Sequence, residues 1–140
     1  MTLFRTILRW FLVAAYLVAG YFHLARPGPF AAITPHWVPD VPLVIMLTGI
    51  AELAGAAALA QGFSRPLRHL AGWALALYAL CVWPANINHF LIDHARTDGG
   101  MGLGYHVPRL LAQPLIIWAA AWASGALDWP FARRLAKARG

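Results

Sequence analysis

Four long apolar segments dominate the sequence and constrain its fold more than any other feature. They cover residues 3–25, 43–61, 69–92 and 107–127, and each is close to the roughly 20 residues that a helix needs to cross a hydrocarbon core. Charged residues make up only 11% of the chain, whereas soluble domains carry about 25%. The sequence therefore predicts an all-α, four-transmembrane-helix bundle that forms a single integral membrane domain over residues 1–140.

Basic residues gather at one end of this predicted bundle. Eight of the eleven lie at the start of the first segment, between the second and third, or after the fourth: Arg5, Arg9, Arg65, Arg68, Arg133, Arg134, Lys137 and Arg139. Because cytoplasmic loops are enriched in Lys and Arg, we expect both termini to be cytoplasmic. The net charge of +6 then reflects topology and attraction to anionic lipids, and we expect no nucleic-acid partner.

The connection between the first two segments is rich in proline and aromatic residues. Proline restricts the backbone, and aromatic residues favour the headgroup boundary, so we predict an ordered outer flap against the mouth of the bundle. The alternative is a stiff interfacial loop in which Trp37 anchors the chain to lipid. The connection over residues 93–106 contains four glycines and predicts a flexible, permissive loop.

Cysteine usage excludes one class of chemistry. Cys81 is the single cysteine, so a thiol relay within this chain is excluded. Cys81 lies inside the third segment, where we expect inert packing. The first segment lacks a convincing signal-peptide cleavage site, so we expect it to remain in the mature protein.

Glu52 is the only charged residue between residues 43 and 61. An ionisable side chain at bilayer depth is costly and normally faces a protein interior or a wet cavity. Gly49, Glu52, Ala56 and Ala60 follow helical steps of three and four residues, which places Glu52 on a face suited to close helix contact. We therefore expect Glu52 to point inward.

Polar residues of the other segments fall at a similar depth. At about 1.5 Å per residue, Glu52 lies roughly 13 Å and Asn86 roughly 9 Å below the outer ends of their helices. The predicted cluster around Glu52 consists of His23, Asn86, His89, Arg109 and Gln113. We predict that the walls of this pocket come from Tyr16, Tyr78, Val82 and Ile117. We also expect Tyr78 and Trp37 to contact the ligand. Pro84 and Pro114 free the carbonyls of Leu80 and Leu110 near this pocket.

Two interpretations of Glu52 remain open at this stage. A carboxyl that reaches His23 or His89 can share or pass a proton, as chemistry at a quinone or a hydroxylated lipid headgroup requires. A carboxyl that only accepts from Asn86 and Gln113 is instead a structural group that ties helices together.

The remaining histidines give weaker signals. His89, Asp93 and His94 have a spacing compatible with a metal ion, but such groups at a helix end are more often solvated, and we predict no metal site. Haem ligation by His23 and His89 is disfavoured because both lie at one level of one leaflet. His36, His69 and His106 lie in or beside loops and are predicted as surface groups.

The assembled residues resemble the DoxX and DoxX-like family of small four-helix membrane proteins. The matching elements are Ala19-Gly20-Tyr21-Phe22-His23, Phe30 with Pro35-His36-Trp37-Val38-Pro39, Gly49-Ile50-Ala51-Glu52-Leu53-Ala54-Gly55, Arg65 and Trp83-Pro84-Ala85-Asn86-Ile87. The resemblance implies a four-helix bundle with His23, Glu52 and Asn86 as functional positions. It also implies divergent roles: quinone-linked thiosulfate oxidation, redox complexes of thiol metabolism, and receptor-assembly chaperoning in an animal relative. The cysteine pair of the similarly built vitamin K epoxide reductases is missing here.

These observations favour a membrane subunit of a redox pathway in the bacterial cytoplasmic (inner) membrane. Its outer-leaflet pocket would bind a quinone or another lipophilic small molecule, with Glu52 and His23 handling protons. Expected partners are membrane lipids, this molecule, and a redox subunit or a second copy of the chain. A non-enzymatic scaffold or assembly chaperone is the competing hypothesis, and a lipid or sterol-like isomerase is a third.

Overall fold

The computed structural model describes residues 2–131, and within them the chain is all-helical. The helices are α1 (Leu3–Ala25), α2 (Gly28–Ile33), α3 (Val41–Ala60), α4 (Arg65–His94) and α5 (Leu103–Ser124). The all-α prediction is confirmed. Three helices, α1, α3 and α4, are long and apolar enough to cross a membrane. The basic residues Arg133, Arg134, Lys137 and Arg139 lie outside the described residues.

Helix α1 has the predicted bounds, whereas the other long helices begin earlier than predicted. The side chains of Asp40 and Ser64 accept hydrogen bonds from Leu43 N and Leu67 N, and each of these helices has a proline in its first two positions. Capping side chains and prolines at the first positions favour the start of a helix. Hydropathy alone does not detect them. At the other end, Gly125 closes α5 with φ 91°, a left-handed cap that ends it three residues before the predicted boundary.

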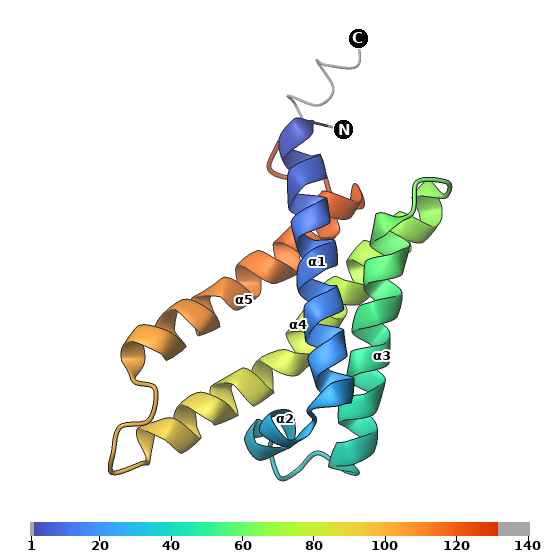
Figure 1. The fold of residues 1–140 in the computed structure, drawn as a ribbon. Helices are drawn as coiled ribbons and strands as arrows, with labels where there is room; N and C mark the ends of the chain where they lie inside the picture. The colour runs from blue at the N-terminus through green and yellow to red at the C-terminus, as the bar shows by residue number, and fades with distance from the viewer. Residues whose placement is uncertain (1, 132–140) are drawn as a thin grey trace.

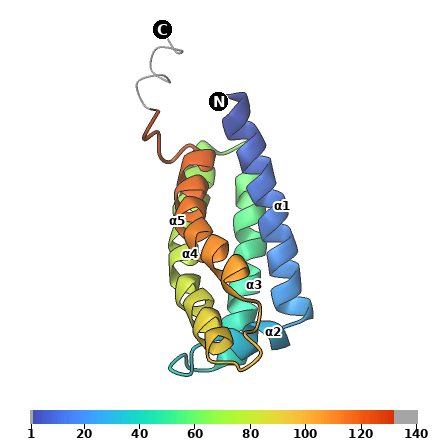
Figure 2. The ribbon, with the colours of Figure 1, turned by 90° about the vertical axis from the view of Figure 1, so that its left-hand side faces the viewer.

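The long helices pack as two antiparallel pairs. Helix α1 packs chiefly along α3, and α4 along α5, while α3 also contacts α4 and α1 contacts α5. Figure 1 shows that α2 lies at the end of the bundle where α1 ends and α3 begins. Figure 2 shows the same end from the side, with the α4–α5 connection nearby. We call this end, with α2 and the α4–α5 connection, the α2 end.

Small residues allow the helices to approach closely. A Cβ added at Gly72 would overlap Ser124 Oγ and lie 2.9 Å from the Ala120 carbonyl oxygen. A Cβ at Gly20 would lie 2.9 Å from the Gly49 carbonyl oxygen. These glycines therefore set the spacing between α4 and α5 and between α1 and α3, as small residues do in membrane helix pairs.

Two arginines of the predicted cytoplasmic end are buried in the bundle. Arg5 donates to Leu127 O at 2.7 Å and pairs with Asp128 at 2.9 Å. Arg68 Nε donates to Ser124 O at 3.1 Å. Because carbonyls at a helix C-terminus lack intrahelical donors, Arg68 stabilises the end of α5, and Arg5 holds the segment that follows it. Cys81 differs from its prediction: it is exposed on the outer side of α4, not packed in the interior.

Candidate functional site

A cavity of about 340 Å³ lies inside the α2 end of the bundle. All five helices contribute to its wall, together with the connection that follows α2. Most of the lining is apolar, and Tyr16 and Val82 line it as predicted, with Ile116 in place of Ile117. Successive side chains of a helix point about 100° apart, so Ile116 faces the cavity and its neighbour Ile117 does not. The polar lining groups are Tyr16, His23, Thr34, Thr48, Glu52, Tyr78, Asn86, Arg109 and Gln113.

Glu52 is buried in this wall, with 4% of its surface exposed. The Tyr78 hydroxyl donates to Glu52 Oε1 at 2.8 Å. His23 Nδ1 lies 2.8 Å from Glu52 Oε2 and 3.0 Å from the Ala19 carbonyl oxygen. One carboxylate therefore contacts side chains from α1 and α4 as well as lying on α3.

The hydrogen on His23 follows from its neighbours. A carbonyl oxygen can only accept, so the contact with Ala19 places the hydrogen on Nδ1. This hydrogen is aligned with the Ala19 carbonyl oxygen. His23 Nδ1 is therefore close to Glu52 Oε2, but no described residue donates an aligned hydrogen bond to this oxygen. A buried oxygen with spare accepting capacity is uncommon in folded proteins. Oε2 therefore keeps unused accepting capacity in the wall of the cavity.

Tyr16 provides a second free polar group at the same wall. It is 7% exposed, and its hydroxyl has no hydrogen-bond partner within residues 2–131. Its ring meets Tyr78 edge to face, with the centroids 6.4 Å apart. Tyr16 and Glu52 thus place a hydroxyl and a carboxylate oxygen with unused hydrogen-bonding capacity in the wall of the cavity.

Asn86 and Gln113 form a separate polar pair. Asn86 Nδ2 donates to Gln113 Oε1 at 3.0 Å, and Gln113 Nε2 donates to the Ala79 carbonyl at 2.6 Å. Neither amide donates to Glu52 in the described structure, so the interpretation of Glu52 as an acceptor for these two residues is wrong. Pro84 cannot donate to Leu80, and Gln113 reaches the adjacent carbonyl of Ala79.

The connection after α1 covers the cavity. Phe30 of α2 stacks on His23 with a centroid distance of 3.7 Å. Asn88 Nδ2 of α4 donates to the Ile33 carbonyl at 2.9 Å, which holds the end of α2 against α4. Trp37 lines the cavity and is 67% exposed.

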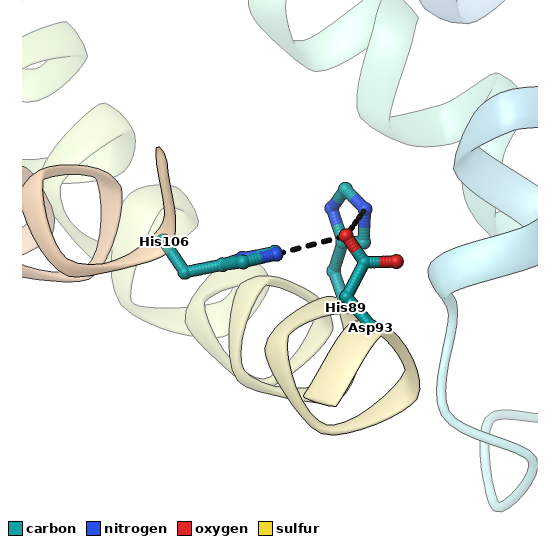
Figure 3. A group of neighbouring side chains, drawn as sticks. All are labelled: His89, Asp93 and His106. Atoms are coloured by element: carbon teal, nitrogen blue, oxygen red, sulfur yellow. Dashed lines mark hydrogen bonds and ion pairs between the residues drawn. The ribbon is translucent and has the colours of Figure 1, made fainter. Parts of the chain in front are cut away.

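His89 lies outside the cavity lining, in contrast to its predicted place beside Glu52. Arg109 Nη1 donates to His89 Nδ1 at 2.7 Å, and His89 Nε2 lies 3.7 Å from Asp93 Oδ2. His106 Nε2 approaches the same oxygen at 3.0 Å (Figure 3). Arg109 itself lines the cavity, so it lies between the two polar groups.

The prediction of His106 as a surface group is wrong, because the side chain is 1% exposed. The predicted helix began at residue 107, whereas α5 begins at Leu103. His106 therefore sits in the first turn of a helix, where it faces α4. The available signal was Gly102, whose φ of 72° suits the residue before a helix start. His94, the predicted neighbour of Asp93, is exposed.

Comparison with known families gives one match. A family model described as "Domain of unknown function (DUF8561)" matches residues 12–123. The chain belongs to the DUF8561 family. The matched range includes every residue that lines the cavity in this DUF8561 member. No curated protein and no solved structure matches the chain.

Proposed function

We propose that all four long helices span the bacterial cytoplasmic membrane, with both termini cytoplasmic and the α2 end in the outer leaflet. Helix α5 has 22 residues, or roughly 33 Å at the rise of an α-helix, which is enough to cross a core of about 30 Å. Its Leu103, Val107, Leu111 and Leu115 are exposed at steps of four residues. This stripe supports a lipid-facing side for α5.

Within this bundle, the cavity binds a lipophilic small molecule with a polar ring, and a quinone fits best. The observation that carries the proposal is Glu52: a buried carboxylate on the cavity wall, bound by Tyr78 and approached by His23. A largely apolar pocket with a few convergent polar groups is typical of small-molecule sites, which range from about 300 to 1,000 Å³. The DoxX resemblance supports the same positions, His23 and Glu52.

The wall chemistry matches both forms of a quinone. A quinone carbonyl accepts hydrogen bonds, which Tyr16 and Arg109 can donate. The hydroxyl of the reduced quinol donates, and Glu52 Oε2 can accept from it. Reduction of a quinone takes two electrons and two protons; Glu52 and His23 would pass protons, and a partner redox subunit would exchange the electrons.

The opening of the cavity supports a ligand that arrives from lipid. Cys81 lines the cavity and is exposed on the outer side of α4. Because Cys81 lies near the middle of a membrane-spanning helix, its outer surroundings are acyl chains. A lipophilic molecule can therefore enter sideways from the bilayer.

The test compares quinone binding by Glu52→Gln with binding by the wild type. Decylubiquinol, the reduced quinone, is titrated into the protein in nanodiscs, and quenching of tryptophan fluorescence is followed. Loss of the carboxylate acceptor should weaken binding of the reduced quinone by roughly tenfold, the equivalent of about 1.4 kcal/mol. Asp98→Asn is the matched control, because Asp98 is an exposed carboxylate paired only with Arg96 and the loop backbone. Equal affinities for wild type and Glu52→Gln would contradict the role of Glu52.

The competing scaffold function also rests on Glu52, since its contacts connect α1, α3 and α4. A pure scaffold would lose thermal stability in Glu52→Gln and would show no saturable quinone binding in the wild type. The same titration therefore separates the two functions.

A further inference from the structure

A second cluster of titratable side chains lies beside the cavity, at the start of the α4–α5 connection. His89 and Asp93 come from the last turns of α4, and His106 comes from the first turn of α5. Their donor atoms all lie within 4.8 Å of one another (Figure 3). Asp93 and His106 are 6% and 1% exposed, so the cluster is largely shielded from solvent.

We propose that His89, Asp93 and His106 bind a first-row divalent transition-metal ion, for which Zn²⁺ is the probe. Two imidazoles and one carboxylate are a donor set that such ions favour. The spacing of four residues puts His89 and Asp93 on one face of α4, and α5 supplies the third donor. The site is separate from the proposed quinone pocket, because none of the three residues lines the cavity.

The distances come within reach of a metal ion after movements of the side chains. Donor atoms about 2.1 Å from a tetrahedral ion lie roughly 3.4 Å from one another. The two distances to Asp93 Oδ2 are 3.0 Å from His106 and 3.7 Å from His89. The donor nitrogens of His89 and His106 lie within 4.8 Å of each other, so the two rings have to approach each other by at most about 1.4 Å. Three protein donors leave a fourth position for water or another ligand.

Hydrogen bonds to Asp93 hold the side chains of this cluster in place when no metal ion is bound. The His106 Nε2–H and the Met101 backbone N–H both donate to Asp93 Oδ2, and His89 Nε2 points to the same oxygen. A divalent cation would bind Nε2 of both imidazoles, the hydrogen of each ring would move to Nδ1, and the carboxylate would balance part of the charge of the cation. The backbone bond from Met101 would keep Asp93 in position in both cases.

Arg109 disfavours the binding of a metal ion by His89. A guanidinium only donates, so its contact with His89 Nδ1 puts the imidazole hydrogen on Nε2, the atom that would bind the metal. Binding requires this hydrogen to leave Nε2. Arg109→Gln, which removes the cationic donor, should therefore bind Zn²⁺ more tightly than the wild type; weaker binding by this variant would overturn the site as drawn.

The main experiment measures Zn²⁺ bound to the full chain, purified without a polyhistidine tag and stripped with EDTA. Equilibrium dialysis followed by elemental analysis should give one ion per chain. His89→Gln and His106→Gln should each lower the affinity by more than about tenfold. His94→Gln is the matched control, since His94 is an exposed imidazole one residue from Asp93, and it should retain the wild-type affinity.

Binding of Co²⁺ provides a second readout, which does not depend on His106→Gln, the variant of a buried side chain. The wild type should show the visible absorption of Co²⁺ held by imidazole donors, and His89→Gln, which alters a partly exposed side chain, should not. Helicity by circular dichroism identifies any variant that fails to fold. The proposal is overturned if the wild type binds no Zn²⁺ saturably, if His89→Gln retains both signals, or if His94→Gln loses as much as His89→Gln.

Discussion

At the scale of single residues, the carboxylate of Glu52 connects three helices. Tyr78 of α4 satisfies one oxygen, and His23 of α1 approaches the other without an aligned hydrogen. One oxygen is therefore satisfied by the protein, and the other keeps accepting capacity in the wall of the cavity. A purely structural carboxyl would be expected to have donors for both oxygens.

Removal of the Tyr78 hydroxyl should destabilise the protein. Tyr78→Phe leaves Glu52 Oε1 buried without its donor, which should cost about 1–3 kcal/mol of unfolding free energy. Thermal unfolding in detergent, followed by circular dichroism, measures the loss. Tyr21→Phe is the control, because Tyr21 is 62% exposed. A Tyr78→Phe variant as stable as Tyr21→Phe would show that this hydrogen bond contributes little.

At the scale of helices, stability depends on close contacts between pairs. Gly72 and Ser124 bring α4 and α5 together at the end remote from the cavity, and Arg68 adds a hydrogen bond to the Ser124 carbonyl. At the other end, hydrogen bonds between side chains join the pair, from Asn86 to Gln113 and from Arg109 to His89.

Gly72→Ala should disturb this contact. The added Cβ would overlap Ser124 Oγ and press on the Ala120 backbone, and overpacking of this kind costs about 1–3 kcal/mol. Gly104→Ala is matched to it, since Gly104 is also helical and nothing lies within 4 Å of its added Cβ. The midpoint of thermal unfolding should fall for Gly72→Ala alone. Equal midpoints for the two variants would mean that α4 and α5 can shift apart at no cost.

The bounds and faces of the helices show which features of the fold can be predicted from the sequence. Helix α1 is apolar over most of its length, so hydropathy predicts its bounds. Helices α3, α4 and α5 begin with polar or capping residues that hydropathy overlooks, and this error placed His106 in a loop. Periodicity within each helix predicts that Glu52 and His23 face inward. It cannot predict that Asn86 and Gln113 bond to each other, because that depends on the rotation and tilt of α5 relative to α4.

At the scale of the whole molecule, the outer surface is apolar and the polar groups lie inside. Large apolar side chains such as Phe11, Leu77 and Leu111 are more than half exposed, as lipid contact requires and water would penalise. Composition alone predicts this arrangement. The location of the cavity, its cover by α2 and its proposed lateral opening at Cys81 depend on tertiary packing, which no single segment encodes.

The lateral opening allows a direct measurement of ligand binding. Cys81 is the only cysteine, so a membrane-permeant maleimide reports on this one position of the cavity. The protein in liposomes is alkylated at increasing concentrations of decylubiquinone, whose fully substituted ring does not add thiols, and the modified fraction is followed by mass spectrometry. A quinone in the cavity should slow the alkylation of Cys81 in a saturable manner. An alkylation rate independent of quinone concentration would contradict the proposed pocket.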